Sequence, residues 1–194
     1  AVSRFGLLFR GVFIVSVALY PFLVFFGLRY LPPGTLALVL ALFLAFRFGV
    51  LTAEEKPVVY PMLVVLMSFA VLVAFLDSQR LLLAYPALVN LFLAITFASS
   101  LRDGSSILLS LVKARKVKIG EYVPRYLARL TLVWVFFFVV NGLIAVWTSM
   151  QSMELWVIYN GLISYIAAGF LIIGELIFRI YYKKRMGVTG DDRT

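Results

Sequence analysis

Three asparagines inside long apolar stretches are the polar side chains that stand out most clearly in this sequence. Asn90 lies in VNLFLAI, Asn141 in VNGLIAV and Asn160 in YNGLISY. An amide that leaves water for hydrocarbon loses its hydrogen-bond partners, so each of these side chains is expected to face protein rather than lipid. Their chemistry is hydrogen bonding, either between helices or with a ligand.

Two interpretations of these amides remain open. One is packing, because Gly142 and Gly161 directly follow two of the asparagines and small residues let helices approach closely. The other is a polar pocket for a lipid head group or a polyprenyl carrier, and Pro86 predicts a helix bend that would open space for it. The candidate pocket residues are Asn90, Asn141, Asn160, Tyr159, Ser164 and Tyr165.

Catalytic and metal-binding chemistry has little support in the composition. The chain has no cysteine and no histidine, which excludes thiolate sites and removes the commonest general base. We therefore predict no catalytic residue, no cofactor and no metal ion. Any catalysis would have to rest on Asp, Glu, Tyr, Lys or Arg, and the candidate acids are Asp103, Glu121 and Glu175. Glu175 is explained more simply by an ion pair with Arg179.

The elements that position these residues are expected to be membrane helices. Hydrophobic residues make up 63% of the 194 residues, whereas soluble domains are nearer 45–50% apolar. We expect an all-α, polytopic membrane helix bundle that forms one transmembrane domain over residues 1–194, and its first helix is expected to be uncleaved. Six stretches have about the length that a bilayer requires: residues 11–30, 35–51, 57–76, 81–101, 127–149 and 155–179.

The distribution of lysine and arginine predicts the orientation of these six helices. With the N-terminus inside, only Arg29 and Arg80 fall in the outer segments, and every other lysine and arginine falls inside. The positive-inside rule then places both termini in the cytoplasm, with residues 180–194 as a basic cytoplasmic tail.

The long connection between the fourth and fifth stretches contains an amphipathic segment, residues 105–118. Its apolar residues recur at helical spacing, which predicts a short helix lying in the membrane interface. Besides setting topology, its cations are candidates for binding membrane lipids or an acidic cytosolic protein. Nucleic acid is not expected as a partner, because the basic run lacks aromatic residues. The cations are Lys113, Arg115, Lys116 and Lys118.

The C-terminal third resembles the bacterial intracellular septation protein A family, also called inner-membrane-spanning proteins, and its predicted-membrane-protein relatives. The resemblance rests on LARLTLVWVFFFVVNGLIAVW, followed by ELWVIYNGLISYIAAG. It implies a non-enzymatic inner-membrane protein that acts as a partner or scaffold in cell-envelope synthesis or division. It also implies a membrane-protein partner, and it suggests an acyl carrier protein as the acidic partner.

Two other functions stay open beside the scaffold. One is a lipid or lipid-carrier transporter with a polar pocket in the outer half of helices four to six, as the three amides and Pro86 suggest. The other is a membrane enzyme that acts on a lipid or acyl substrate at the inner face. The first requires space beside the amides, and the second would use Asp103, Glu121 or Glu175.

The predicted orientation can be tested with single thiols, because the chain has no native cysteine. A membrane-impermeant maleimide added from outside should label Ser152→Cys and spare Lys116→Cys until the membrane is permeabilised, because the two positions are expected on opposite sides. The reverse labelling pattern would contradict the orientation.

Overall fold

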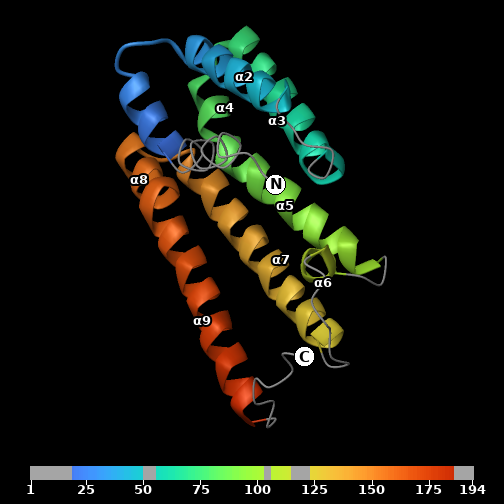
Figure 1. Cartoon of the computed structure of the whole chain (residues 1–194). Coiled ribbons are helices and arrows are strands. Elements are labelled where there is room, and N and C mark those ends of the chain that lie inside the picture. Colours follow the sequence, from blue (N-terminus) through green and yellow to red (C-terminus); the bar gives the residue numbers. More distant parts are fainter. Residues whose placement is uncertain (1–18, 50–55, 103–105, 115–122, 186–194) are drawn as a thin grey trace, which may run out of the picture.

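The computed structural model describes residues 19–49, 56–102, 106–114 and 123–185, and every regular element in these ranges is a helix (Figure 1). The all-α prediction is therefore confirmed for this part of the chain. After a helix over residues 19–27, the elements are α2 (Pro33–Gly49), α3 (Lys56–Leu76), α4 (Gln79–Leu83), α5 (Tyr85–Arg102), α6 (Ile107–Ala114), α7 (Val123–Thr148), α8 (Met153–Ile158), η1 (Tyr159–Ile163) and α9 (Ser164–Arg185).

Within the described residues, three helical segments are long and apolar enough to cross a membrane: Tyr85–Arg102, Val123–Thr148 and Met153–Ile177. By helix length and composition the chain is therefore a membrane protein. The 17 residues of α2 extend over only about 25 Å, less than a typical hydrocarbon core of about 30 Å. The count of six spans and the orientation stay predictions, and residues 11–18 of the first stretch lie outside the described residues.

Helices α2 and α3 pack against each other as an antiparallel hairpin. A hydrogen bond from the N-terminus of α2 to the residue after α3 also joins them. The backbone N–H of Gly34 donates to the Asp77 carboxylate at 2.6 Å, so a negative charge lies at the N-terminus of α2, where the helix dipole favours it. Asp77 adopts a left-handed conformation with φ of 45°. A Cβ on Gly34 would lie 2.8 Å from the Ala74 carbonyl oxygen, so only glycine permits this approach.

The fourth predicted stretch is interrupted near its start. Helix α4 ends at Leu83, and Ala84 separates it from α5. Pro86 has no N–H, so the Leu82 carbonyl loses the donor that an unbroken helix would supply. The Ala87 N–H bonds to the Ala84 carbonyl at 3.0 Å, one residue short of the α-helical pattern, so the Leu83 carbonyl also lacks its regular donor. The bend predicted at Pro86 is therefore present.

Two distant side chains supply the missing donors. The Tyr20 hydroxyl donates to the Leu82 carbonyl at 2.9 Å, and the Trp156 indole N–H donates to the Leu83 carbonyl at 2.8 Å. Trp156 is fully buried, and its ring lies 6.4 Å from that of Tyr20 in an edge contact. The helix over residues 19–27, the α4–α5 break and α8 are thereby joined at one end of the long helices.

The long helices pack unequally. Of the described helices, α5 and α7 pack against each other most extensively, whereas α7 and α9 make few close backbone contacts. Figure 1 shows α7 and α9 joined at the short turn before α8 and spread apart beyond it. Toward the other end of α9, the Tyr126 hydroxyl donates to Glu175 at 3.0 Å and bridges the two helices. The side chain of Arg179, the predicted partner of Glu175, lies outside the described residues.

The amphipathic segment of the long connection contains the helix α6. Ser106 caps it by accepting the Leu109 N–H at 3.3 Å, and Leu109 is buried where α6 packs on α7. Lys113 is exposed, and Arg115, Lys116 and Lys118 lie outside the described residues. The position of α6 in a membrane interface stays a prediction.

The role of the Tyr20 hydroxyl can be isolated with a double-mutant cycle. Tyr20→Phe should lower the free energy of unfolding by about 1–3 kcal/mol, because it leaves a buried carbonyl unpaired. In a Pro86→Ala background the new N–H can bond to the Leu82 carbonyl, so the same substitution should cost less. Unfolding by dodecyl sulfate in mixed micelles measures each value, and equal costs in the two backgrounds would refute this account of the break.

Candidate functional site

A chain of side-chain hydrogen bonds joins α5, α7 and η1 in the protein interior. The Asn141 amide donates to the Asn90 side-chain oxygen at 3.0 Å, and the Tyr159 hydroxyl donates to the Asn141 side-chain oxygen at 2.8 Å. The Asn90 amide donates to the Pro86 carbonyl at 2.8 Å. A backbone carbonyl can only accept, so this last bond fixes the orientation of both asparagines.

Asn160 lies in a second polar group and is not hydrogen-bonded to the Asn90–Asn141 pair. Its amide donates to the Thr148 hydroxyl at 3.1 Å and to the Trp156 carbonyl at 3.0 Å. Thr148 is seven residues after Asn141, which corresponds to about 10 Å along α7. The sequence predicts one cluster of three amides, whereas the structure divides them into a pair and a separate amide near the α7–α8 turn.

The local backbone around Asn160 is a π-helical turn, η1. The Ser164 N–H bonds to the Tyr159 carbonyl five residues earlier, and the Ser164 hydroxyl donates to the Asn160 carbonyl at 3.1 Å. Such turns are rare and occur frequently at functional sites. In this protein the turn brings Gly161 against the helix over residues 19–27, where an added Cβ would lie 3.0 Å from the Phe22 ring.

Gly142 performs a comparable packing role between α5 and α7. An added Cβ there would lie 3.2 Å from the Asn90 Cβ, so the absence of a side chain lets the two helices approach at the level of the amide pair. The close approach and the Asn90–Asn141 bond occur at the same point of contact. A small residue and an amide–amide hydrogen bond at the same helix–helix contact are what the packing interpretation requires.

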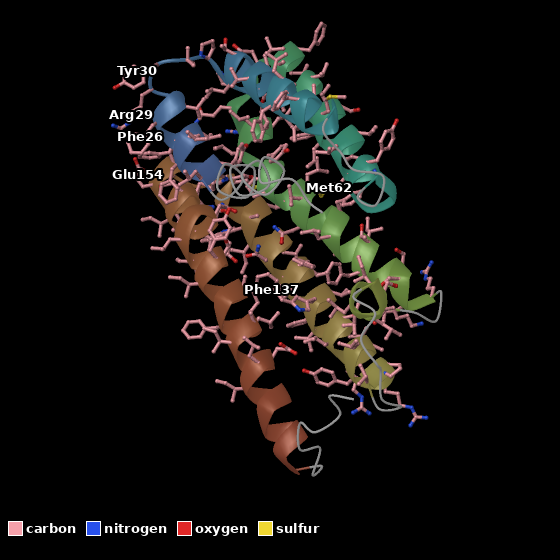
Figure 2. The ribbon with its side chains drawn as sticks, in the orientation of Figure 1. Phe26, Arg29, Tyr30, Met62, Phe137 and Glu154 are labelled. Atoms are coloured by element: carbon pink, nitrogen blue, oxygen red, sulfur yellow. The ribbon has the colours of Figure 1, made fainter. Side chains whose placement is uncertain are left out.

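A cavity of about 500 Å³ lies beside both polar groups. Its wall is mostly apolar and is formed by the helix over residues 19–27 and by α2, α3, α4, α5, α7, η1 and α9; Met62 on α3 and Phe137 on α7 are labelled in Figure 2. Of the predicted pocket residues, Tyr159 is absent from the lining and contributes through its bond to Asn141. Those that line the cavity are Asn90, Asn141, Asn160, Ser164 and Tyr165.

The wall offers hydrogen bonds and apolar contact but no charge. None of the described side chains that line the cavity is acidic or basic. Within the described residues, no group of acids could hold a metal ion. The arrangement can therefore bind an apolar or uncharged polar molecule.

Several residues that build this site were not identified as site residues by the sequence analysis. Tyr20, Tyr85, Trp134 and Phe137 line the cavity, and Trp156 bonds to the Leu83 carbonyl, next to the cavity-lining Leu82. A tryptophan near the end of an apolar stretch usually indicates a place at the membrane surface. The one usable signal was Pro86, because a proline inside a helix frees carbonyls that some buried donor must satisfy.

Comparison of the chain with protein-family models, with curated proteins and with solved structures finds no match in any of the three. The resemblance to the septation protein A family stays a prediction. The cavity and its hydrogen-bonding groups are therefore the features of the described residues that bear on function.

The amide chain should contribute to stability in a definite order. Asn141→Ala leaves both the Asn90 oxygen and the Tyr159 hydroxyl without their partner, so it should lower the free energy of unfolding by about 1–3 kcal/mol. Tyr159→Phe removes one bond and should cost about 0.6 kcal/mol, the average for such bonds in membranes. Unfolding in mixed micelles tests this order. Equal costs would contradict the order, and negligible costs would show that these bonds do not stabilise the fold.

Proposed function

We propose that this membrane protein binds the hydrocarbon chain of a membrane lipid in the cavity. The observation that carries the proposal is the cavity itself, which measures about 500 Å³ and is lined in part by the three segments that are long and apolar enough to cross a bilayer. Ligand sites in proteins commonly measure about 300–1,000 Å³ and combine apolar walls with a few polar groups. This wall has that composition.

The composition of the cavity wall supports an apolar occupant, since most of its lining residues are hydrophobic. Water fills polar cavities, whereas an apolar wall favours hydrocarbon. In a bilayer the most abundant source of hydrocarbon is a lipid chain.

The divergence of α7 and α9 supports access from the bilayer. Cavity-lining residues of α7, such as Phe137 and Asn141, and of α9, such as Tyr165 and Ala168, come from the two helices that make few close contacts. The turn before α8 and the Tyr126–Glu175 bond join these helices on either side of this stretch. A lipid chain could enter between them without unfolding either helix.

The functions expected from the sequence relate differently to this proposal. The lipid or lipid-carrier transporter is the one that requires a pocket beside the amides, and lipid binding is its first step. The partner or scaffold role in cell-envelope synthesis, which the family resemblance implies, stays a prediction and is compatible with a bound lipid. The membrane enzyme, expected at the inner face with Asp103, Glu121 or Glu175, stays a prediction, and the lipid-binding proposal does not depend on it.

Lipid occupancy can be tested by blocking the cavity at one residue and leaving its neighbour as control. Ala168 lines the cavity, whereas nothing lies within 4 Å of a Cβ on the adjacent Gly169. Ala168→Phe should fill part of the space and reduce the lipid retained in native mass spectrometry at least about tenfold. Gly169→Phe should retain the lipid of the wild-type protein. Absence of lipid from the wild-type protein, or equal loss in both variants, would refute the proposal.

A further inference from the structure

One amide in the cavity wall has an unused hydrogen-bond acceptor. Asn160 is 96% buried, since only 4% of its surface is exposed, and its amide nitrogen donates to Thr148 and Trp156. The Trp156 carbonyl can only accept, which fixes the nitrogen toward it and the side-chain oxygen away from it. No group in the described chain donates to that oxygen, although buried polar groups nearly always have a partner.

The rest of the cavity wall also contains hydrogen-bonding capacity that the described residues leave unused. Asn90 and Asn141 each donate through the amide nitrogen once, and an amide nitrogen carries two hydrogens. The Tyr85 hydroxyl is buried beside the Tyr20 ring and has no hydrogen-bond partner among the described residues. The apolar wall is thus interrupted by one free acceptor and by free donors, all uncharged.

The absence of charged side chains from the described lining restricts the ligand further. A phosphate or carboxylate taken into this cavity would lose its water without meeting a cation, and burying an unpaired charge is far more costly than burying a neutral polar group. The part of the ligand that enters the cavity must therefore be neutral. It must also carry a donor, because the Asn160 oxygen can only accept.

We propose that the cavity selects an uncharged long-chain amphiphile with a free hydroxyl group, and that the Asn160 side-chain oxygen accepts the hydrogen bond from this hydroxyl. The inference rests on the proposed function, since it requires that a hydrocarbon chain occupies the cavity. It adds the chemical class of the head group: a neutral alcohol rather than a phosphate ester or an anionic lipid.

The test uses three probes that share one chain: hexadecanol, hexadecyl methyl ether and hexadecyl phosphate. Each competes with a photoactivatable hexadecanol for labelling of the full-length protein in lipid nanodiscs, and peptide mapping confirms labelling at the cavity. Hexadecanol should compete at least about tenfold better than the ether, which lacks the donor, and than the phosphate, which brings a charge. Equal competition by alcohol and ether, or stronger competition by the phosphate, would overturn the head-group assignment.

Two variants test whether Asn160 causes the preference for alcohol over ether. Asn160→Ala should abolish the preference for alcohol over ether, whatever its effect on overall affinity. Ser164→Ala removes another cavity-lining polar group, whose hydroxyl bonds to the Asn160 backbone carbonyl, and should keep the preference. Retention of the preference in Asn160→Ala would overturn the role given to its oxygen. If Asn160→Ala fails to fold, the wild-type series still decides the head-group class.

The same experiment separates the two proposals. If none of the hexadecyl probes reaches the cavity, the proposed lipid binding is wrong, and the inference falls with it. If the probes label the cavity but alcohol, ether and phosphate compete equally, lipid binding stands and only the selection of a hydroxyl is wrong. An acceptor that is satisfied by water alone would give this second pattern.

Discussion

The structure depends on how two backbone carbonyls near Pro86 find hydrogen-bond donors. The break at Pro86 removes their helical donors, and the surroundings are too apolar for water to replace them. The Tyr20 hydroxyl and the Trp156 indole N–H meet this demand at Leu82 and Leu83. In hydrocarbon an unpaired carbonyl is costly, so these two bonds favour one relative placement of the helix over residues 19–27, the α4–α5 break and α8. The arrangement of the cavity wall follows from that placement.

The long helices form one close interface, between α5 and α7, and one open interface, between α7 and α9. Between α5 and α7, the Asn90–Asn141 bond and the small size of Gly142 allow close contact. Between α7 and α9, the bonds of Asn160 and the π-helical turn lie near the short connection, and beyond them the helices separate. The sequence presents packing and a pocket as alternatives, but the two occur together. The Asn90–Asn141 bond joins two packed helices, whereas Asn160 lies where the helices begin to separate.

The chemistry of the cavity is defined by what its wall contains. Amide and hydroxyl groups provide directional bonds at little electrostatic cost, whereas a buried charge would require a partner that the described lining does not offer. A site of this kind discriminates among uncharged molecules by whether each buried acceptor and donor is matched. That is why the unused oxygen of Asn160 is more informative about a ligand than the larger apolar surface around it.

The sequence by itself determined the all-helical class, the membrane character, the residues of the long helices to within a few positions, and the burial of the three asparagines. These follow from composition, from the length of apolar stretches and from the cost of a polar group in lipid, all of which act locally along the chain. Only the tertiary structure decided that the amides form two groups and that a cavity lies beside them. Those features depend on contacts such as Tyr20–Leu82 and Trp156–Leu83, which join residues 62 and 73 positions apart and leave no local pattern.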